Sequence, residues 1–196
     1  PTSLGTYNYS VSISGCIPRT FYGQIISRGQ SLVLTSSPNT NNQSVCLGNT
    51  ISNIVYNTGG NINSSNISVT GLPPGITYLL NSGTITINGS SNQLGTYNYT
   101  VSITGSVCSG QSSTLTASGT ISIINTPTII ITTDYCSQPG KVKLKAIPTP
   151  SGTYTYYWNN GATTPILNIS SPGTYSVQVT DALGCVKNST TATFTL

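Results

Sequence analysis

The chain has 196 residues, of which six are Lys or Arg, two are Asp or Glu and none is His, so its formal net charge is +4. Acid–base catalysis, metal binding and glycoside hydrolysis need groups of His, Asp or Glu side chains. The composition therefore argues against an enzyme and against a metal or other cofactor. Apolar runs stay below the roughly 18 residues that span a membrane, so we expect no direct membrane insertion.

The first element belongs to an internal repeat. Residues 4–15 recur as residues 94–105, with only two Ser/Thr exchanges, and the interval from each copy to a later cysteine, Cys46 or Cys136, is also the same. In each copy apolar and polar residues alternate, as in a half-buried strand. Repetition at such a period indicates an array of modules, which tilts the expected function toward structure or adhesion.

Further alternating or β-branched runs follow along the chain, separated by Gly-, Pro- and Asn-rich turns. Short strands at this spacing predict an all-β protein of tandem Ig-like Greek-key β-sandwiches in an extended array. We expect the C-terminal part of a preceding module at 1–36, a PKD-like module at 37–125 and a last Ig-like module at 126–196. The opening segment cannot bury a core alone, so either an upstream chain or another polypeptide completes it. The runs lie at 67–69, 84–87, 119–123, 128–132, 154–158, 175–179 and 192–195.

Three of the six basic residues, Lys141, Lys143 and Lys145, alternate with apolar residues in one short segment. This pattern is typical of an edge strand protected from pairing with other sheets. It is too narrow for a nucleic-acid footprint, and we expect no nucleic acid as a partner.

The five cysteines occupy corresponding places in the repeat. The correspondence predicts disulfides from Cys46 to Cys108 and from Cys136 to Cys185, and leaves Cys16 unpaired or paired outside this chain. Sequence alone does not fix connectivity. Disulfides persist in oxidising surroundings, so they predict a protein outside the cytoplasm. A zinc or redox site is disfavoured because no CxxC pair and no histidine is present.

An aromatic strand in the last module is the one candidate for a sugar-binding platform. Alternation places Tyr154, Tyr156 and Trp158 on one face. The Trp of the third Ig strand normally packs in the core, so core packing is the favoured interpretation and glycan binding the alternative. Tyr7, Tyr97 and Tyr175 each follow Gly-Thr, and we expect their hydroxyl groups to satisfy backbone groups at sandwich corners.

The last module carries two characteristic motifs. They are Tyr154-Thr-Tyr-Tyr-Trp-Asn-Asn-Gly-Ala-Thr-Thr164 and Ile169-Ser-Ser-Pro-Gly-Thr-Tyr-Ser-Val-Gln-Val-Thr-Asp-Ala-Leu-Gly-Cys185. In order and spacing they resemble the SprB repeat of giant gliding-motility adhesins of Bacteroidetes. The middle module resembles the PKD-like and Ig-type modules found beside those repeats. The resemblance implies type IX secretion, attachment at the outer surface and display as a stalk or filament.

The sequence thus predicts a non-enzymatic segment of an extracellular surface adhesin, with neighbouring modules of the same polypeptide as partners. Two alternatives remain. One is a carbohydrate-binding or spacer module appended to a secreted hydrolase, with surface glycans as partners. The other is a self-assembling filament subunit, in which residues 1–36 are completed by another copy of the chain.

Overall fold

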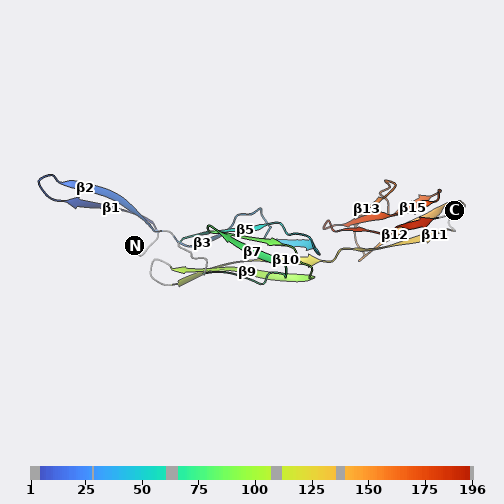
Figure 1. The fold of residues 1–196 in the computed structure, drawn as a ribbon, viewed down its shortest axis with the longest axis horizontal. Helices are drawn as coiled ribbons and strands as arrows, with labels where there is room; N and C mark the ends of the chain where they lie inside the picture. The colour runs from blue at the N-terminus through green and yellow to red at the C-terminus, as the bar shows by residue number, and fades with distance from the viewer. Residues whose placement is uncertain (1–4, 28, 61–65, 107–111, 136–139, 195–196) are drawn as a thin grey trace. The chain divides into compact units, whose positions relative to one another are not determined.

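The computed structural model describes residues 5–27, 29–60, 66–106, 112–135 and 140–194, and within these ranges the regular elements are all β-strands. The chain divides into two compact units. The first comprises residues 1–43 and 50–122, and the second comprises residues 44–49 and 123–196. Figure 1 shows the strands in chain order.

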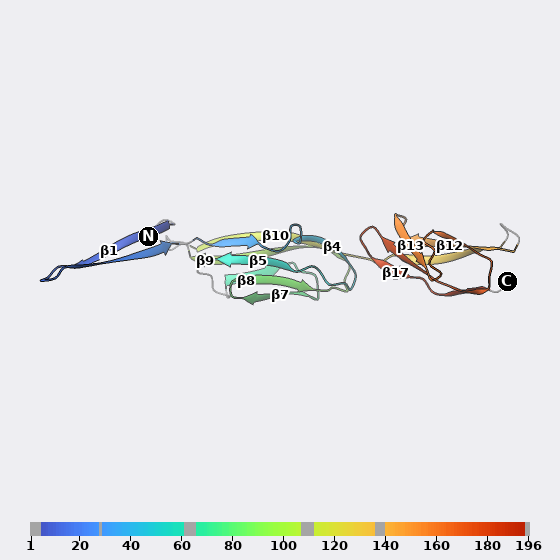
Figure 2. The ribbon, with the colours of Figure 1, turned by 90° about the horizontal axis from the view of Figure 1, so that it is seen from above.

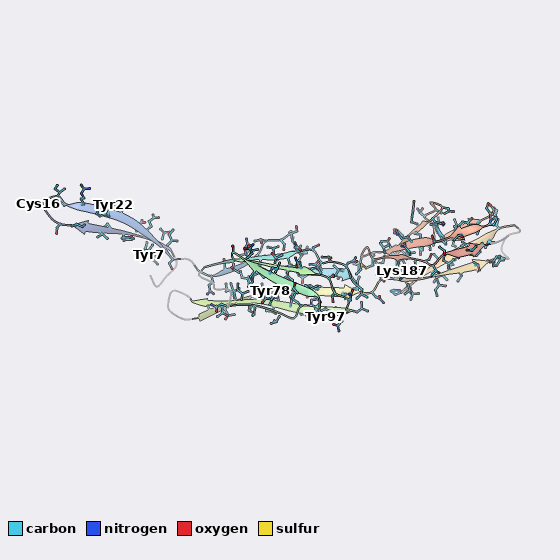
Figure 3. All side chains as sticks on the ribbon, viewed as in Figure 1. Tyr7, Cys16, Tyr22, Tyr78, Tyr97 and Lys187 are labelled. Carbon is cyan, nitrogen blue, oxygen red and sulfur yellow. A yellow bond between two sulfur atoms is a disulfide. The ribbon has the colours of Figure 1, made fainter. Side chains whose placement is uncertain are left out.

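The first two strands form a hairpin that pairs only with itself. β1 (Gly5–Ile13) and β2 (Arg19–Ser27) are antiparallel, and Tyr9 lies opposite Gly23 in their register. Figure 3 places Cys16 at the turn of this hairpin and Tyr22 on β2. The alternation is regular, yet among the described residues no further strand pairs with this hairpin and its apolar side chains stay exposed. The exposed apolar side chains of the hairpin are Tyr9, Val11, Ile13, Ile17, Phe21, Tyr22, Ile25 and Ile26.

The first sheet of the middle sandwich has the strand order β3-β5-β8-β7. Its three described pairings are antiparallel. Ser31–Leu34, which the predicted boundary at residue 36 assigned to the preceding module, is an edge strand of this sheet. The strands are β3 (Ser31–Leu34), β5 (Ile54–Gly59), β7 (Ile76–Asn81) and β8 (Thr84–Gly89).

The second sheet has the order β4-β10-β9-β6, so the chain alternates between the two sheets from β3 to β7, whereas β7 and β8 share the first sheet and β9 and β10 share the second. Figure 2 shows the two layers from above. This division of strands is the Ig-like arrangement. The strands are β4 (Asn42–Cys46), β6 (Ile67–Thr70), β9 (Gly95–Ser106) and β10 (Ser112–Ile124).

The core of the middle sandwich consists of the inward residues of both sheets, because every second side chain of a strand points to the same face. Tyr99, Val101 and Ile103 on β9 are fully buried, as the alternation predicts. They meet Tyr56 and the isoleucines of the opposite sheet. The other buried apolar residues of this sandwich are Ile51, Ile54, Ile76, Ile85, Ile87 and Ile121.

The outer face of β9 and β10 is held by hydroxyl and amide groups. Thr96 and Ser122 are 3.2 Å apart at their hydroxyl oxygens, and Thr120 Oγ1 donates a hydrogen bond to Asn98 Oδ1 (3.0 Å). Such cross-strand pairs stabilise a sheet without any formal charge. On β9 and β10 these Ser, Thr and Asn side chains therefore form the polar face of the sheet.

The turn before β7 depends on a glycine. Gly71 has φ of 79°, and a Cβ there would collide with the backbone oxygen of Asn98. Only a residue without a side chain combines this left-handed conformation with so close a backbone approach. The turn predicted between the strands is thus fixed by sterics.

The second unit is a smaller sandwich. One sheet has the order β11-β12-β14, a second the order β13-β16-β17, and β15 pairs with β18. Its strands are β11 (Thr128–Asp134), β12 (Val142–Thr149), β13 (Tyr154–Trp158), β14 (Ile166–Ile169), β15 (Gly173–Tyr175), β16 (Val177–Asp181), β17 (Val186–Asn188) and β18 (Ala192–Phe194).

The lysine-bearing strand β12 is central in its sheet, so the edge-strand prediction is wrong. Val142, Leu144 and Ala146 are buried in the core as their alternation predicts. β11 and β14 occupy the two sides of β12, which leaves no free edge for the lysines to protect. Their side chains lie on the solvent face instead.

Two of the predicted corner tyrosines, Tyr97 and Tyr175, make the expected hydrogen bonds to backbone carbonyls. The hydroxyl of Tyr175 donates to the carbonyl of Ser171 (3.1 Å), and that of Tyr97 donates to the carbonyl of Leu94 (3.4 Å). Tyr154 also follows Gly-Thr but was not among the predicted corner residues, and its hydroxyl donates to the carbonyl of Pro150 in the same way (2.7 Å).

Candidate functional site

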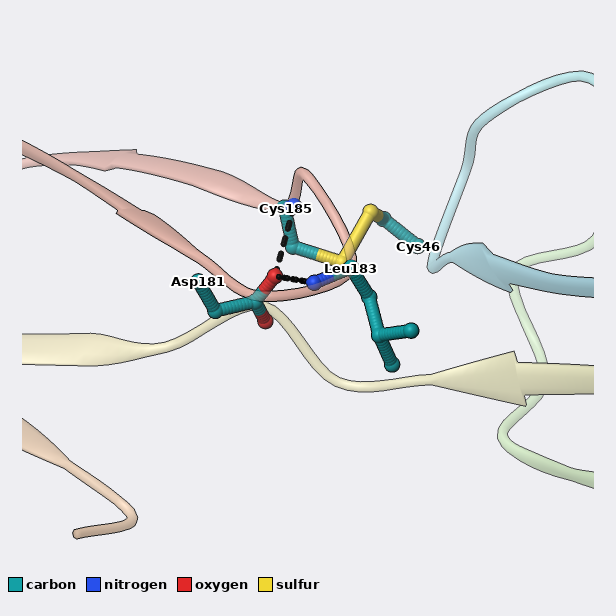
Figure 4. Close-up of a disulfide and its surroundings, with 4 residues drawn as sticks. All are labelled: Cys46, Asp181, Leu183 and Cys185. Carbon is teal, nitrogen blue, oxygen red and sulfur yellow. Dashed lines mark hydrogen bonds between the residues drawn. A yellow bond between two sulfur atoms is a disulfide. The ribbon is translucent and has the colours of Figure 1, made fainter. Parts of the chain in front are cut away.

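The candidate functional site is a disulfide between the end of β4 and the turn that joins β16 to β17. Cys46 and Cys185 are bonded, with Cα atoms 5.6 Å apart and a sequence separation of 139 residues. Both cysteines belong to the second compact unit. Cys185 is fully buried and Cys46 is 6% exposed, so solvent barely reaches either residue. Figure 4 shows the bond and its surroundings.

The turn that holds Cys185 is organised by Asp181. Its Oδ1 accepts hydrogen bonds from the backbone N–H groups of Leu183 (2.9 Å) and Cys185 (2.8 Å), both drawn in Figure 4. The backbone of Asp181 also bonds to Gly184 and Cys185, and Gly184 adopts φ of 83°. A carboxylate that accepts two N–H groups fixes a turn strongly. One of the two acidic residues of the chain thus has a structural role.

The turn that holds Cys46 is fixed by backbone contacts. The carbonyl of Cys46 accepts from the N–H of Asn49 (2.9 Å), and the N–H of Leu47 donates to the carbonyl of Ile124 (2.8 Å). These bonds fix the backbone around Cys46 within residues 44–49, which belong to the second unit.

This bond corrects the predicted pairing. Cys46 was expected to pair with Cys108, and Cys185 with Cys136, but Cys46 and Cys185 pair with each other. Cys108 and Cys136 lie outside the described residues. Repeat correspondence identifies which positions hold cysteines, but bonding also requires Cα atoms about 4.4–6.8 Å apart, which sequence does not report. Cys16 has no disulfide partner and is exposed.

The aromatic strand β13 does not present the predicted ligand-facing residues. Trp158 is fully buried in the core cluster and donates Nε1–H to the carbonyl of Thr164 (2.8 Å). Tyr154 and Tyr156 are partly buried against the same cluster. Core packing, the favoured interpretation, is confirmed for Trp158, and Tyr154 and Tyr156 are partly buried against the same core. The physical reason is that this face of β13 lies against the other sheet.

The opposite face of β13 presents Tyr157, which is 60% exposed. In the strand register Tyr157 lies opposite Gln178, and Gln178 lies opposite Asn188, so the three form one row across β13, β16 and β17. Gln178 Nε2 donates to Asn188 Oδ1 (3.1 Å). The row borders an open pocket of about 300 Å³. This row was not predicted, although alternation along β13 alone sends Tyr157 outward.

A buried pair of hydroxyl groups lies in the core of the middle sandwich. The hydroxyl oxygens of Tyr56 and Tyr99 are 3.1 Å apart. Burial, and then the hydrogen bond with Tyr56, raises the pKa of Tyr99 far above its usual value of 10.0. This pair joins the two sheets, and both rings are buried, so it serves stability and offers no accessible reactive group.

Among the described residues no group of three or more His, Cys, Asp and Glu side chains could hold a metal ion. Among the same residues no helix is long and apolar enough to cross a membrane.

Comparisons with known proteins identify no family. No protein-family profile matches the chain, and no curated protein matches it. Similar solved structures include the Ig1-2 module of the Drosophila receptor protein tyrosine phosphatase DLAR, at 14% identity over 85% of this chain and 97% of that one, with a TM-score of 0.36.

Two further structures are similar to this chain. The I67–I69 I-band fragment of titin is 13% identical over 83% of this chain and 64% of that fragment, with a TM-score of 0.45. Domains 4–9 of the surface layer protein SbsC are 13% identical over 97% of this chain and 35% of that fragment, with a TM-score of 0.38. The chain therefore spans less than two thirds of these two fragments. By its own strand topology, the chain is an all-β protein of the Ig-like β-sandwich class.

Proposed function

We propose that this chain is a non-enzymatic, load-bearing segment of a large extracellular bacterial adhesin, in which Ig-like modules follow one another as units of a stalk or filament. The main support is the repeated hairpin. In β9 the residues Tyr99, Val101 and Ile103 are buried by a second sheet, whereas their counterparts Tyr9, Val11 and Ile13 in β1 are exposed. Because the two strands have the same sequence pattern, we expect the apolar face of β1 to be covered by a second sheet, as that of β9 is.

Neighbouring modules are the proposed partners of this hairpin. A covering module would pair with β1 and pack against its apolar face, as β6 pairs with β9 and the sheet of β5 and β8 covers it. Each module would then bury its own strand faces and contact mainly its neighbours, so the length of the array grows by copying.

The finer assignment follows the sequence motifs. Their resemblance to SprB repeats supports a gliding-motility adhesin exported by the type IX system and attached to the outer membrane. The buried disulfide supports an oxidising, extracellular location. The composition supports a non-catalytic role, since there is no histidine and there are only two acidic residues.

Surface display is tested with antibodies against this chain on intact cells of the source organism. We expect labelling that external protease removes without lysis. Labelling that appears only after permeabilisation would contradict the proposal.

The hairpin is tested by fusing residues 31–93 in front of Leu4. Because residues 4–15 repeat residues 94–105, the junction reproduces the native connection between residues 93 and 94. We expect amide hydrogen exchange in β1 to slow to the range of β9. Unchanged exchange in β1 would refute a covering module. Concentration-dependent polymerisation of the unfused chain would instead support the filament alternative.

Glycan binding is a second candidate function, favoured by the row of Tyr157, Gln178 and Asn188. An exposed ring beside uncharged amide groups suits a neutral sugar, which stacks on the ring and hydrogen-bonds to the amides. Tyr157→Ala is expected to abolish binding on a glycan array, while Thr155→Ala, two residues away on the same strand face, leaves it unchanged. Absence of binding by the unmutated chain would remove this candidate.

A further inference from the structure

The Cys46–Cys185 bond determines which part of the chain bears load when its two ends are pulled. Tension from the N-terminal side reaches Cys46, crosses the sulfur–sulfur bond and continues from Cys185 to the C-terminal side. A covalent bond does not break at the forces that separate paired strands. The polypeptide between the two cysteines therefore carries no tension. We infer that this disulfide is a mechanical bypass that keeps residues 47–184 out of the path of force.

The bypassed segment contains most of the residues that form both cores, with Phe194 of the second unit outside it. Strands β5 to β16 all lie between Cys46 and Cys185 in the sequence. They include the hydroxyl pair of Tyr56 and Tyr99 and the fully buried Trp158. The strands on the force path are β1 to β4, β17 and β18, and their pairings can open while the strands between the cysteines remain folded.

The bond is placed so that it persists. Attack by a thiolate requires access to a sulfur atom. Cys185 is fully buried and Cys46 nearly so, and Asp181 clamps the turn behind Cys185 through two hydrogen bonds. Exposed Cys16, by contrast, is open to solvent and lies outside the bypassed segment.

The bond removes a long stretch of polypeptide from the extensible part of the chain. The separation of 139 residues corresponds to about 500 Å of extended chain at roughly 3.6 Å per residue, whereas the bond spans 5.6 Å between Cα atoms. The tensioned path consists only of residues 1–46 and 185–196, which extend to about 200 Å, while the uncrosslinked chain of 196 residues extends to about 700 Å.

This inference rests on the proposed function only for the source of tension, because the bypass itself is a property of the bonded chain. The experiment is single-molecule force spectroscopy on the full chain, held by handles at both ends under oxidising conditions. We expect the fully extended oxidised chain to reach about 200 Å, and Cys46→Ser to add about 500 Å. Cys185→Ser should give the same gain, and the matched control Cys16→Ser should give none.

Reduction of the unmutated protein provides the same comparison without a substitution. Under load, dithiothreitol donates two electrons and two protons to the bond, which yields two cysteine thiols and a cyclic disulfide of the reagent. The chain between the two cysteines can then extend, and the measured length should increase by about 500 Å. Full extension of the oxidised chain to about 700 Å, or peptide mapping that shows another partner for Cys46, would overturn the inference. Failure of surface labelling on cells would refute the proposed function and leave this result intact.

Discussion

Replacement of the same tyrosine in the two copies of the repeat separates the contribution of local sequence from that of tertiary packing. Tyr9 and Tyr99 lie in nearly identical strands, but Tyr9 is 48% exposed and Tyr99 is fully buried. Tyr99→Ala removes a buried ring and leaves the hydroxyl of Tyr56, 3.1 Å away, without its partner. Tyr9→Ala removes a half-exposed ring that lies beside Gly23 of the neighbouring strand.

The expected costs differ by several kcal/mol. Truncation of a buried aromatic residue to Ala costs about 3–5 kcal/mol, and an unpaired buried hydroxyl adds up to about 1–3 kcal/mol. We therefore expect Tyr99→Ala to lower the free energy of unfolding of the middle sandwich by about 4–8 kcal/mol, a large share of the 5–15 kcal/mol typical of a domain. For Tyr9→Ala we expect at most about 1 kcal/mol, the scale of one cross-strand pair.

The measurement is amide hydrogen exchange under urea, read in β5 and β8, which report on the middle sandwich. A loss of protection in Tyr99→Ala beside unchanged protection in Tyr9→Ala is the expected result. If the two variants changed the free energy by equal amounts, within about 1 kcal/mol, the assignment of stability to the covering sheet would be refuted.

Three further outcomes are expected. Trp158→Phe should destabilise the second unit by about 1–3 kcal/mol, because the carbonyl of Thr164 loses its donor, and thermal unfolding monitored by circular dichroism checks this. Gly119→Ala should destabilise the middle sandwich, because a Cβ there would collide with the carbonyl of Asn41. Gly23→Ala should cost less, because only the half-exposed ring of Tyr9 must move. Equal urea unfolding midpoints of the two variants would contradict this. The free energy of unfolding of the middle sandwich should fall above pH 10, by up to about 1.4 kcal/mol per pH unit. The reason is that the raised pKa of Tyr99 keeps its hydroxyl neutral in the folded state, whereas in the unfolded state the same hydroxyl ionises. Tyr99→Phe should therefore flatten a plot of the urea unfolding midpoint against pH.

Period-two alternation predicted several strands well. The run at 154–158 is β13 at the same bounds, and the runs at 67–69 and 84–87 lie within β6 and β8. Strand β4 was missed because Asn42, Gln43 and Ser44 carry no alternating apolar side chains. A strand at a sheet edge needs backbone partners more than it needs an apolar face.

Alternation predicts which side chains share a face but not whether a second layer covers that face. For this reason Val101 is buried and Val11 is exposed, although their strands have the same pattern. The disulfide shows the same limit, because its partners lie 139 residues apart and only the folded chain brings them together. The lysine pattern of β12 likewise reported a solvent face and not a position at the edge of the sheet.

The hydroxyl and amide pairs on the outer face of β9 and β10 have a consequence at the scale of a cell surface. No Lys, Arg, Asp or Glu occurs from residue 29 to residue 133, so this stretch neither repels nor attracts its neighbours through formal charge. In a dense layer of such chains, steric size and hydration would set the distance between neighbours. A change from low to high ionic strength would therefore leave that distance unaltered.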